Sequence, residues 1–404
     1  MTTPISTEPL VVRAAFAVLF AAAGFAQGRV LVVDSQNRPG TNFMDLPAAE
    51  AAAADGDVLQ VRDGSYRPFT TRKALSVVMD AGAAIPHTLA LPQPAFQIVG
   101  LPAGRTFKLM GFRGRPRLSG TFFGDVVVGQ CAGTVVLDRV EAYGGFAAAV
   151  SVSDSAGVFL NGCSVTSTGL VVTNSAVVLA DCVVSGDVEY PLAHALQFDR
   201  PAVEANNASL WIAGSALTGG SRVANLGLGQ SALRLVNSHA DIAGDHTALV
   251  AGTDGTPVSA IDGTGSTVRI DPAVALTPSG GAPPIGPFVA ATSANLPSLS
   301  APGAPRGGTV ATDLFGQPGD AYLLLLGTPG SRIPVVGLGD VWLDVAAGMT
   351  IAGTGTIPTS RHAGMTIRVP DVPILLGFSF AWQGVGGSPA SGFAVSNPVA
   401  YVHD

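Results

Sequence analysis

Apolar residues recur along this chain in a fixed pattern of four columns. Segments such as VFLNGCSV place two apolar residues two positions apart, a small residue three positions later, and a last apolar residue after two more. A two-residue step is the period of a β-strand, and the three-residue step marks a corner before a second strand. The matching copies are TVVLDRVEA (134–142), GVFLNGCSV (157–165), AVVLADCVV (176–184), SLWIAGSAL (209–217), ALRLVNSHA (232–240) and TVRIDPAVA (267–275).

This repeat predicts a solenoid of stacked coils in which each column becomes a ladder of like residues. FKLMGFRG (107–114) fits as an earlier copy. An antiparallel sandwich also has short alternating strands, but it does not keep one register through six copies. The first column is Val135, Val158, Val177, Leu210, Leu233 and Val268, and the second is Leu137, Leu160, Leu179, Ile212, Leu235 and Ile270. The column of small residues is Val140, Cys163, Cys182, Ser215, Ser238 and Ala273.

The segment 30–69 supports the same fold. Asp45 can cap a helix from about Leu46 to Ala54, which Gly56 ends, and a Gly-x-Tyr turn follows at 64–66. Together with the coil pattern, this segment resembles the right-handed parallel β-helix proteins of the pectate-lyase-like superfamily over residues 30–277. The resemblance implies an all-β solenoid whose first coil is covered by a short helix. It says little about activity, because that fold carries lyases, hydrolases, esterases, adhesins and non-catalytic proteins.

Four regions are predicted along the chain. Residues 1–26 have the basic, apolar and small-residue parts of an export signal, with cleavage before Gln27. Residues 27–277 form the β-helix, and 278–304 form a linker rich in Pro, Gly and Ala. Residues 305–404 contain seven short strand candidates separated by turns, which predicts a small Ig-like β-sandwich.

Composition limits the classes of partner and the cellular location that we expect for this protein. Charged residues make up 12% of the chain and the formal net charge is −7, so no basic surface for nucleic acid is expected. After the N-terminus, no apolar run reaches the ~18 residues of a membrane span. We expect a secreted or cell-surface monomer whose partner is an extracellular polysaccharide or the cell envelope. The three cysteines permit at most one intramolecular disulfide, and the sequence leaves open whether Cys163 and Cys182 are bonded.

Catalytic chemistry has a weak signature. A polysaccharide lyase needs carboxylates that hold Ca²⁺, and a glycosidase needs paired carboxylates beside one bond. The outward positions beside the ladder are instead Val136, Phe159, Val178, Trp211, Arg234 and Arg269. Polar residues concentrate in the insertion 186–204 and in the later segment 244–255. They give candidate catalytic residues at Glu189, His194, Asp199 and Arg200, and candidate ligand-binding residues at Tyr190, Trp211, Asp245 and His246.

Two functions remain open at this stage. The first is a non-catalytic structural or carbohydrate-binding protein without a cofactor or metal. The second is a polysaccharide lyase or glycosidase that uses the residues of the 186–204 insertion, and only the lyase form of it would need Ca²⁺.

Overall fold

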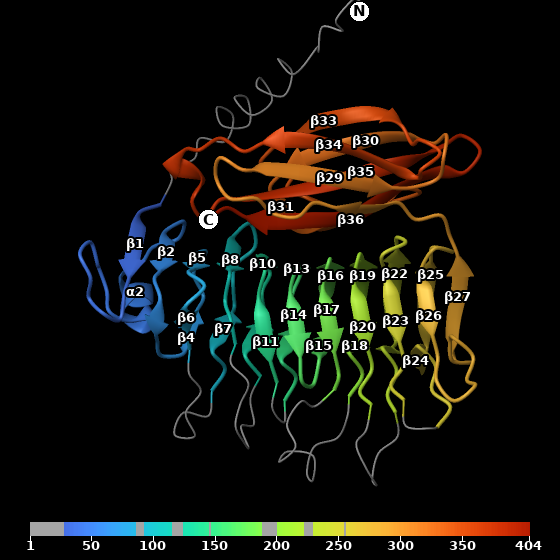
Figure 1. The fold of residues 1–404 in the computed structure, drawn as a ribbon, viewed down its shortest axis with the longest axis horizontal. Helices are drawn as coiled ribbons and strands as arrows, with labels where there is room; N and C mark the ends of the chain where they lie inside the picture. The colour runs from blue at the N-terminus through green and yellow to red at the C-terminus, as the bar shows by residue number, and fades with distance from the viewer. Residues whose placement is uncertain are drawn as a thin grey trace, which may run out of the picture.

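The computed structural model describes residues 28–85, 93–114, 124–144, 147–187, 200–221, 229–253 and 256–404. The predicted export signal therefore lies outside the described residues. The described chain forms a parallel β-helix, with a second, antiparallel β domain lying along one of its faces (Figure 1).

The β-helix is built from long parallel sheets whose strands come from successive coils. The longest, called the long sheet here, runs in the order β1 (Val30–Val33), β2 (Val58–Val61), β5 (Ser76–Met79), β8 (Thr106–Met110), β10 (Thr134–Asp138), β13 (Gly157–Asn161), β16 (Ala176–Ala180), β19 (Ser209–Ala213), β22 (His239–Ala243), β25 (Ser266–Ile270) and β27 (Val289–Ser293). The second sheet runs in the order β24 (Ile261–Thr264), β21 (Leu233–Val236), β18 (Val203–Asn206), β15 (Leu170–Thr173), β12 (Val150–Ser153), β9 (Val126–Gly129), β7 (Phe96–Val99) and β4 (Phe69–Thr71).

Shorter strands complete each coil. The third sheet consists of β11 (Glu141–Tyr143), β14 (Ser164–Thr166), β17 (Val183–Ser185), β20 (Ala216–Thr218), β23 (Ala248–Val250) and β26 (Ala275–Thr277). In the first coils, β3 (Gly64–Ser65) pairs with β6 (Ala83–Ala84).

The predicted ladders exist in the long sheet. Val135 pairs in register with Val158, and that column continues through Val177 and Leu210. These side chains are buried and belong to one continuous core. The earlier copy also fits, because Phe107 pairs with Val135 and Leu109 with Leu137.

The small-residue column packs the corner after the long sheet. The thiols of Cys163 and Cys182 and the hydroxyl of Ser215 each donate to a carbonyl of the preceding coil, those of Leu137, Leu160 and Leu179, at 3.3, 3.3 and 3.4 Å. Cys163 and Cys182 are buried and not bonded to each other. Burial raises the pKa of the Cys163 thiol well above its usual range, so the thiol stays protonated. Cys163 therefore packs the corner as a small apolar side chain and is not a reactive thiol.

One copy of the repeat was assigned to the wrong sheet. Leu233, Leu235 and their neighbours form β21 of the second sheet, where Leu233 pairs with Val203. The partner of Leu210 in the long sheet is Ala240 of β22. The two sheets share the same alternation of apolar residues, so the pattern alone cannot tell a strand of one from a strand of the other.

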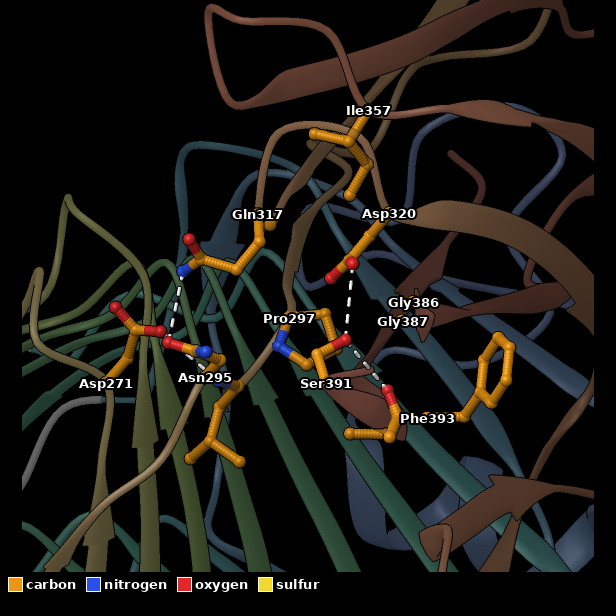
Figure 2. Close-up of a pocket in the computed structure, with 14 residues that line it drawn as sticks. Asp271, Asn295, Pro297, Gln317, Asp320, Ile357, Gly386, Gly387, Ser391 and Phe393 are labelled. Carbon is orange, nitrogen blue, oxygen red and sulfur yellow. Dashed lines mark hydrogen bonds between the residues drawn. The ribbon is translucent and has the colours of Figure 1, made fainter. Parts of the chain in front are cut away.

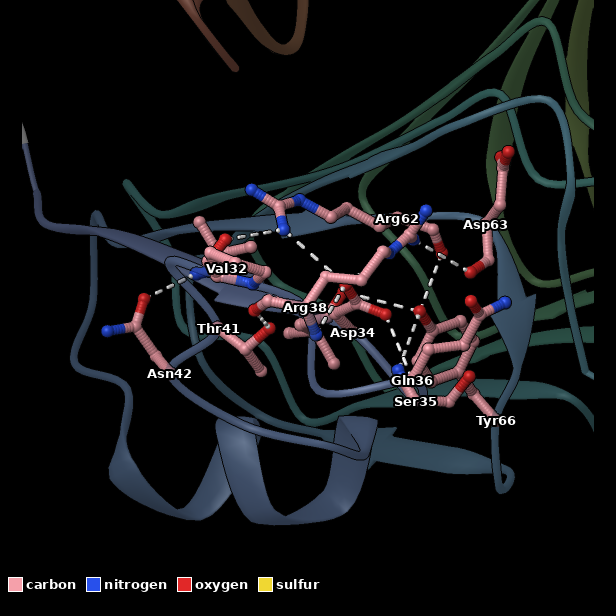
Figure 3. A network of polar contacts seen from close by, with 12 residues as sticks. Val32, Asp34, Ser35, Gln36, Arg38, Thr41, Asn42, Arg62, Asp63 and Tyr66 are labelled. Atoms are coloured by element: carbon pink, nitrogen blue, oxygen red, sulfur yellow. Dashed lines mark hydrogen bonds and ion pairs between the residues drawn. The ribbon is translucent and has the colours of Figure 1, made fainter.

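The first coil is closed as the sequence predicted, though the helix is shorter. Helix α2 (Leu46–Ala52) begins at Asp45, whose side chain accepts a hydrogen bond from the Leu46 amide, and Pro47 stands in its first turn. Beside it, the buried carboxylate of Asp34 accepts hydrogen bonds from Arg38 Nε at 2.7 Å and from the Gln36 amide (Figure 3). The Arg38 guanidinium holds the pKa of Asp34 well below its usual range.

Tyr66 of the Gly-x-Tyr turn completes this end. Its hydroxyl donates to the carbonyl of Arg62 at 2.6 Å and accepts from the Ser35 amide (Figure 3). The network of Figure 3 therefore ties the first two coils together and shields the end of the solenoid, which would otherwise expose its core.

The C-terminal domain is a sandwich of two antiparallel sheets around one core. One sheet has the order β33 (Met349–Thr356), β30 (Ala321–Gly327), β35 (Ser379–Ser388) and β36 (Gly392–Val402). The other has the order β28 (Ser298–Ser300), β29 (Thr309–Phe315) and β34 (His362–Arg368). A hairpin of β31 (Pro329–Val335) and β32 (Gly339–Leu343), and a 3-10 turn η1 (Pro373–Leu375), complete the domain. An Ig-like strand connection stays a prediction.

The segment 278–304 differs from the predicted linker. It contains β27, which adds a last strand to the long sheet beside β25, and β28, which pairs with β29. Only Val289 of β27 is buried, so the strand lacks the apolar alternation by which the earlier coils are found.

The C-terminal domain covers the outward face of the long sheet (Figure 1). Trp342 of β32 contacts Phe159 edge-to-face, with ring centroids 5.5 Å apart. The outward residues Val136, Phe159, Val178 and Trp211 are each at most 2% exposed. An apolar outward ladder, unusual on a free solenoid surface, is therefore the docking face for the second domain.

Candidate functional site

The candidate residues of the 186–204 insertion are mostly beyond the structure. Glu189, Tyr190, His194 and Asp199 lie outside the described residues. Arg200 is half-buried, and its backbone carbonyl accepts a hydrogen bond from the Gly220 amide at 3.0 Å. Their proposed catalytic role therefore stays a prediction.

Trp211 does not offer a surface for stacking a sugar. It lies on the outward face of β19 but is 2% exposed, in a cluster that includes Trp342 and Val402 of the C-terminal domain. The domain that covers it could not be located from local pattern.

Asp245 and His246 lie at the corner after β22, next to the C-terminal domain. His362 of β34 bridges two carboxylates there, with Nε2 3.2 Å from Asp245 Oδ2 and Nδ1 2.9 Å from Asp313 Oδ2. The His246 ring is 6.3 Å from that of His362, and its side chain is 78% exposed. Both ring nitrogens of His362 are thus engaged. Through its contact with Asp245, this side chain links the C-terminal domain to the β-helix at the surface.

A ladder of polar residues follows the opposite corner of the coils, between the second sheet and the long sheet. Asp154, Asn174, Asn207 and Asn237 have φ between 48° and 50°, and Gly265 continues the row at 61°. This left-handed conformation favours Gly, Asn and Asp, which explains the residue types at the corner. Each corner amide donates to the next coil, as from Asn207 N to Val236 O at 2.9 Å, so stacking fixes the geometry.

The corner ladder lines an open groove of about 780 Å³. The side chains of Asn174, Asn207 and Asn237 are exposed, and Asn174 Nδ2 donates to Asp154 Oδ1 at 3.0 Å. In the described part of the chain, the side-chain amides of Asn207 and Asn237 make no hydrogen bond to protein groups, whereas their backbone amides donate to the next coil. The groove is also lined by Ser155, Ser175, Ser209, His239, Thr267 and Arg332.

One ion-pair network anchors the far end of the groove. Asp241 of β22 accepts hydrogen bonds from Arg269 Nε and Nη2 at 2.6 and 2.7 Å, and it lies 3.1 Å from His239 Nε2. Burial acts to raise the pKa of Asp241, but the hydrogen bonds from His239 and Arg269 outweigh it and hold the pKa below its usual value. The other His239 nitrogen, Nδ1, lies 2.9 Å from Thr267 Oγ1. The network therefore fixes the orientation of the His239 ring.

The C-terminal domain contributes one residue, Arg332, to the described lining of the groove. Arg332 projects from β31 and pairs with Asp340 of β32 at 2.6 Å. The same hairpin packs against β13, where a side chain on Gly157 would approach the Ser331 backbone at 3.4 Å. The groove thus lies mainly on the β-helix, beside the hairpin of the C-terminal domain.

Comparison with known proteins finds no matching family model and no match among curated proteins. Two solved structures are similar in part. The enzymatically active domain of bacteriophage CBA120 tailspike protein 2 is 10% identical, with a TM-score of 0.33 over 85% of this chain and 71% of that one. Full-length tailspike protein 2, described as from Escherichia coli O157:H7 bacteriophage CAB120, is 10% identical, with a TM-score of 0.30 over 87% of this chain and 60% of that one.

Another pocket is too small for a polymer or a cofactor. It lies between the loop after β25 and the end of the sandwich, where Gln317 Nε2 donates to Asn295 Oδ1 and Ser391 Oγ to Asp320 Oδ1, both at 3.2 Å (Figure 2). Its volume of about 50 Å³ is room for one or two waters. Among the described residues, no cluster of His, Cys, Asp or Glu could hold a metal ion. None of the described helices has the length and apolar character that a membrane span requires.

Sequence reasoning missed the groove, although a signal was present. Asn or Asp followed by Ser, or Gly followed by Ser, recurs just before the long-sheet strands, as in Asn174-Ser175, Asn237-Ser238 and Gly265-Ser266. The Ser hydroxyls form a second ladder under the first, with the Ser155 amide donating to Ser175 Oγ and the Ser238 amide to Ser266 Oγ, both at 3.0 Å. A search for repeated turn residues as well as repeated apolar residues would have located this corner.

Proposed function

We propose that this protein binds an extended extracellular polysaccharide along the groove of the corner ladder. The observation that carries the proposal is the row of exposed side-chain amides of Asn174, Asn207 and Asn237, on successive coils, in a groove that spans those coils. Parallel strands stack ~4.8 Å apart, so the row presents hydrogen-bonding groups at regular intervals. A polymer with a regular repeat and many hydroxyls fits such a row, because each unit can meet equivalent partners.

The chemistry of the groove favours binding over cleavage. Of the described lining residues, His239 and Arg332 are ionisable, and both are already paired, with Asp241 and Asp340. Glycoside cleavage by the common route needs two carboxyl groups flanking one bond. The export signal predicted at residues 1–26 would place the protein where such polymers occur, at the cell surface or outside the cell.

Asn-to-Gly variants test the groove with little disturbance of the fold. Glycine accepts the left-handed conformation, so Asn207→Gly with Asn237→Gly removes two amides and keeps the corner backbone. At roughly 0.5–1.5 kcal/mol for each lost hydrogen bond, the double variant should bind roughly five- to 150-fold more weakly. Binding would be measured by calorimetry against a panel of acidic and neutral polysaccharides.

Asn37→Gly is the matched control, because Asn37 has φ 52° but lies at the N-terminal end, outside the groove. Equal affinity of the double variant and the wild type would reject the groove as the binding site. Release of new reducing or unsaturated ends from the same polymers, lost in Asp199→Ala and His194→Ala, would instead establish the lyase or glycosidase alternative.

A further inference from the structure

A second cavity lies between the two domains, far along the long sheet from the groove. Its volume is about 270 Å³, near the small end of the range for ligand pockets. The first strands of the long sheet form its floor through Val58, Ser76 and Lys108, and the C-terminal domain forms its walls. Most of its apolar lining comes from Pro329, Ala347, Ile374, Leu376 and Phe378.

Among the described residues that line this cavity, Lys108 is the one cationic side chain. Its Nζ donates to the carbonyl of Gly377 at 3.1 Å and lies 5.4 Å from the centre of the Phe378 ring. The same carbonyl also accepts from Ser76 Oγ at 2.7 Å. Within the described residues, Lys108 has no carboxylate at ion-pair distance. A lysine ammonium has three donors, so at least one stays available toward the cavity.

The acidic residue on the cavity wall, Asp344, has one carboxylate oxygen engaged in its own turn and no ion pair with Lys108. Asp344 Oδ1 accepts hydrogen bonds from the amides of Ala346 and Ala347, at 3.0 and 3.2 Å, in its own turn. Burial lowers the pKa of Lys108 to about 8, as expected for an ammonium group without a counter-ion. A buried charge without a partner is costly, and an anion that enters the cavity removes that cost.

We propose that this interdomain cavity binds a small organic carboxylate, with Lys108 as its counter-ion and Leu376 and Phe378 against its apolar part. The small volume excludes a polymer, and the apolar walls favour an aromatic or short aliphatic acid over an inorganic anion. The site is separate from the polysaccharide groove and goes beyond the proposed function. Because both domains line it, the bound acid would also hold the domains together.

Lysine-selective NMR can test the site in the full chain, since Lys73 and Lys108 are the only lysines. With ¹³C-labelled lysine, benzoate is the probe and benzamide its uncharged match. Benzoate should shift the Lys108 Cε signal saturably at millimolar concentration and raise its titration midpoint above that of the free protein. Benzamide should bind at least tenfold more weakly, and the Lys73 signal should not move.

Two variants keep the result interpretable. Lys108→Met should lose at least tenfold in benzoate affinity, measured by calorimetry, while Lys73→Met should not. Should Lys108→Met fail to fold, Ala347→Phe fills the cavity from its half-exposed rim and leaves the amine in place. It should abolish the shift at Lys108. Equal shifts at both lysines, no saturable shift at Lys108, or undiminished binding in Lys108→Met or Ala347→Phe would each overturn the proposal.

Discussion

His403 shows how strongly the C-terminal core controls a single ionisable residue. Its ring lies between Phe380 and Tyr401, with centroids 5.4 and 5.1 Å away, and Nδ1 donates to the Ala304 carbonyl at 3.2 Å. Nε2 is buried and has no hydrogen-bond partner. Burial lowers the pKa of His403 to about 4, so the folded domain holds the neutral ring.

This residue should make stability depend on pH. In the unfolded chain His403 is protonated once the pH falls below its usual pKa of ~6.5. In the folded state the ring stays neutral until the pH falls to about 4. Its contribution is therefore complete above pH ~6.5 and is lost as the pH falls from there to about 4. The loss should be roughly 2–3 kcal/mol, measured by urea unfolding of the wild type and of His403→Gln.

The exposed His246 provides the comparison for His403. His246→Gln should keep the pH dependence of the wild type, whereas His403→Gln should flatten it. The same slope in all three proteins would contradict a buried neutral His403.

At the scale of elements, a few polar contacts set how the strands of the two domains meet. The buried carboxylate of Asp138, at the end of β10, accepts from the Val402 amide of β36 at 3.0 Å and from Asn161 Nδ2 at 3.0 Å. Arg139 pairs with Asp138 and donates to the Val402 carbonyl at 3.1 Å. These hydrogen bonds join specific atoms of β10 and β36, so they fix the position of β36 on the long sheet.

Removal of this carboxylate should weaken docking. Asp138→Ala leaves the Val402 amide and Asn161 Nδ2 buried without their acceptor, which should cost roughly 2–4 kcal/mol in the free energy of unfolding. Glu141→Ala removes a carboxylate three positions later whose pairing with Arg113 is at the surface, and it should cost less than ~1 kcal/mol. Urea unfolding of both variants measures the difference, and equal costs would argue against the docking role.

At the scale of the whole molecule, the chain folds back on itself. The β-helix advances coil by coil, and the C-terminal domain returns along the long sheet until Val402 reaches β10 (Figure 1). The interdomain cavity depends on this return, since its walls come from the second domain, and the groove takes Arg332 from it. The β-helix alone would carry neither in complete form.

A truncated chain that ends at Ala304 should therefore be prone to aggregation. It would expose Val136, Phe159, Val178 and Trp211 as one apolar strip, and exposed strips of this kind promote association. We expect aggregation and strong binding of a hydrophobic dye. The same truncation with Phe159→Thr and Trp211→Thr should be more soluble, as measured by light scattering. A monodisperse truncated chain with an unchanged strip would contradict the role of the strip as a docking face.

The sequence predicted the fold because its dominant signal is local and repeated. Columns such as Val135, Val158 and Val177 follow from stacked coils, and the Asp45 cap and the Tyr66 turn follow from short-range hydrogen bonding. The sequence failed where two sheets share one alternation, as for Leu233, and where β27 buries a single residue. In both places the missing information was which strand lies beside which.

The sites were decided by the tertiary structure alone. Trp211 was an outward residue in the pattern, yet whether it meets a sugar or another domain depends on where residues 305–404 dock. Lys108 had no distinguishing neighbour in the sequence, and its surroundings come from Gly377 and Phe378, more than 260 positions away. Repetition along the chain specifies a ladder because each coil packs against an equivalent neighbour. It cannot specify what covers the ladder, because those contacts join residues that share no local pattern.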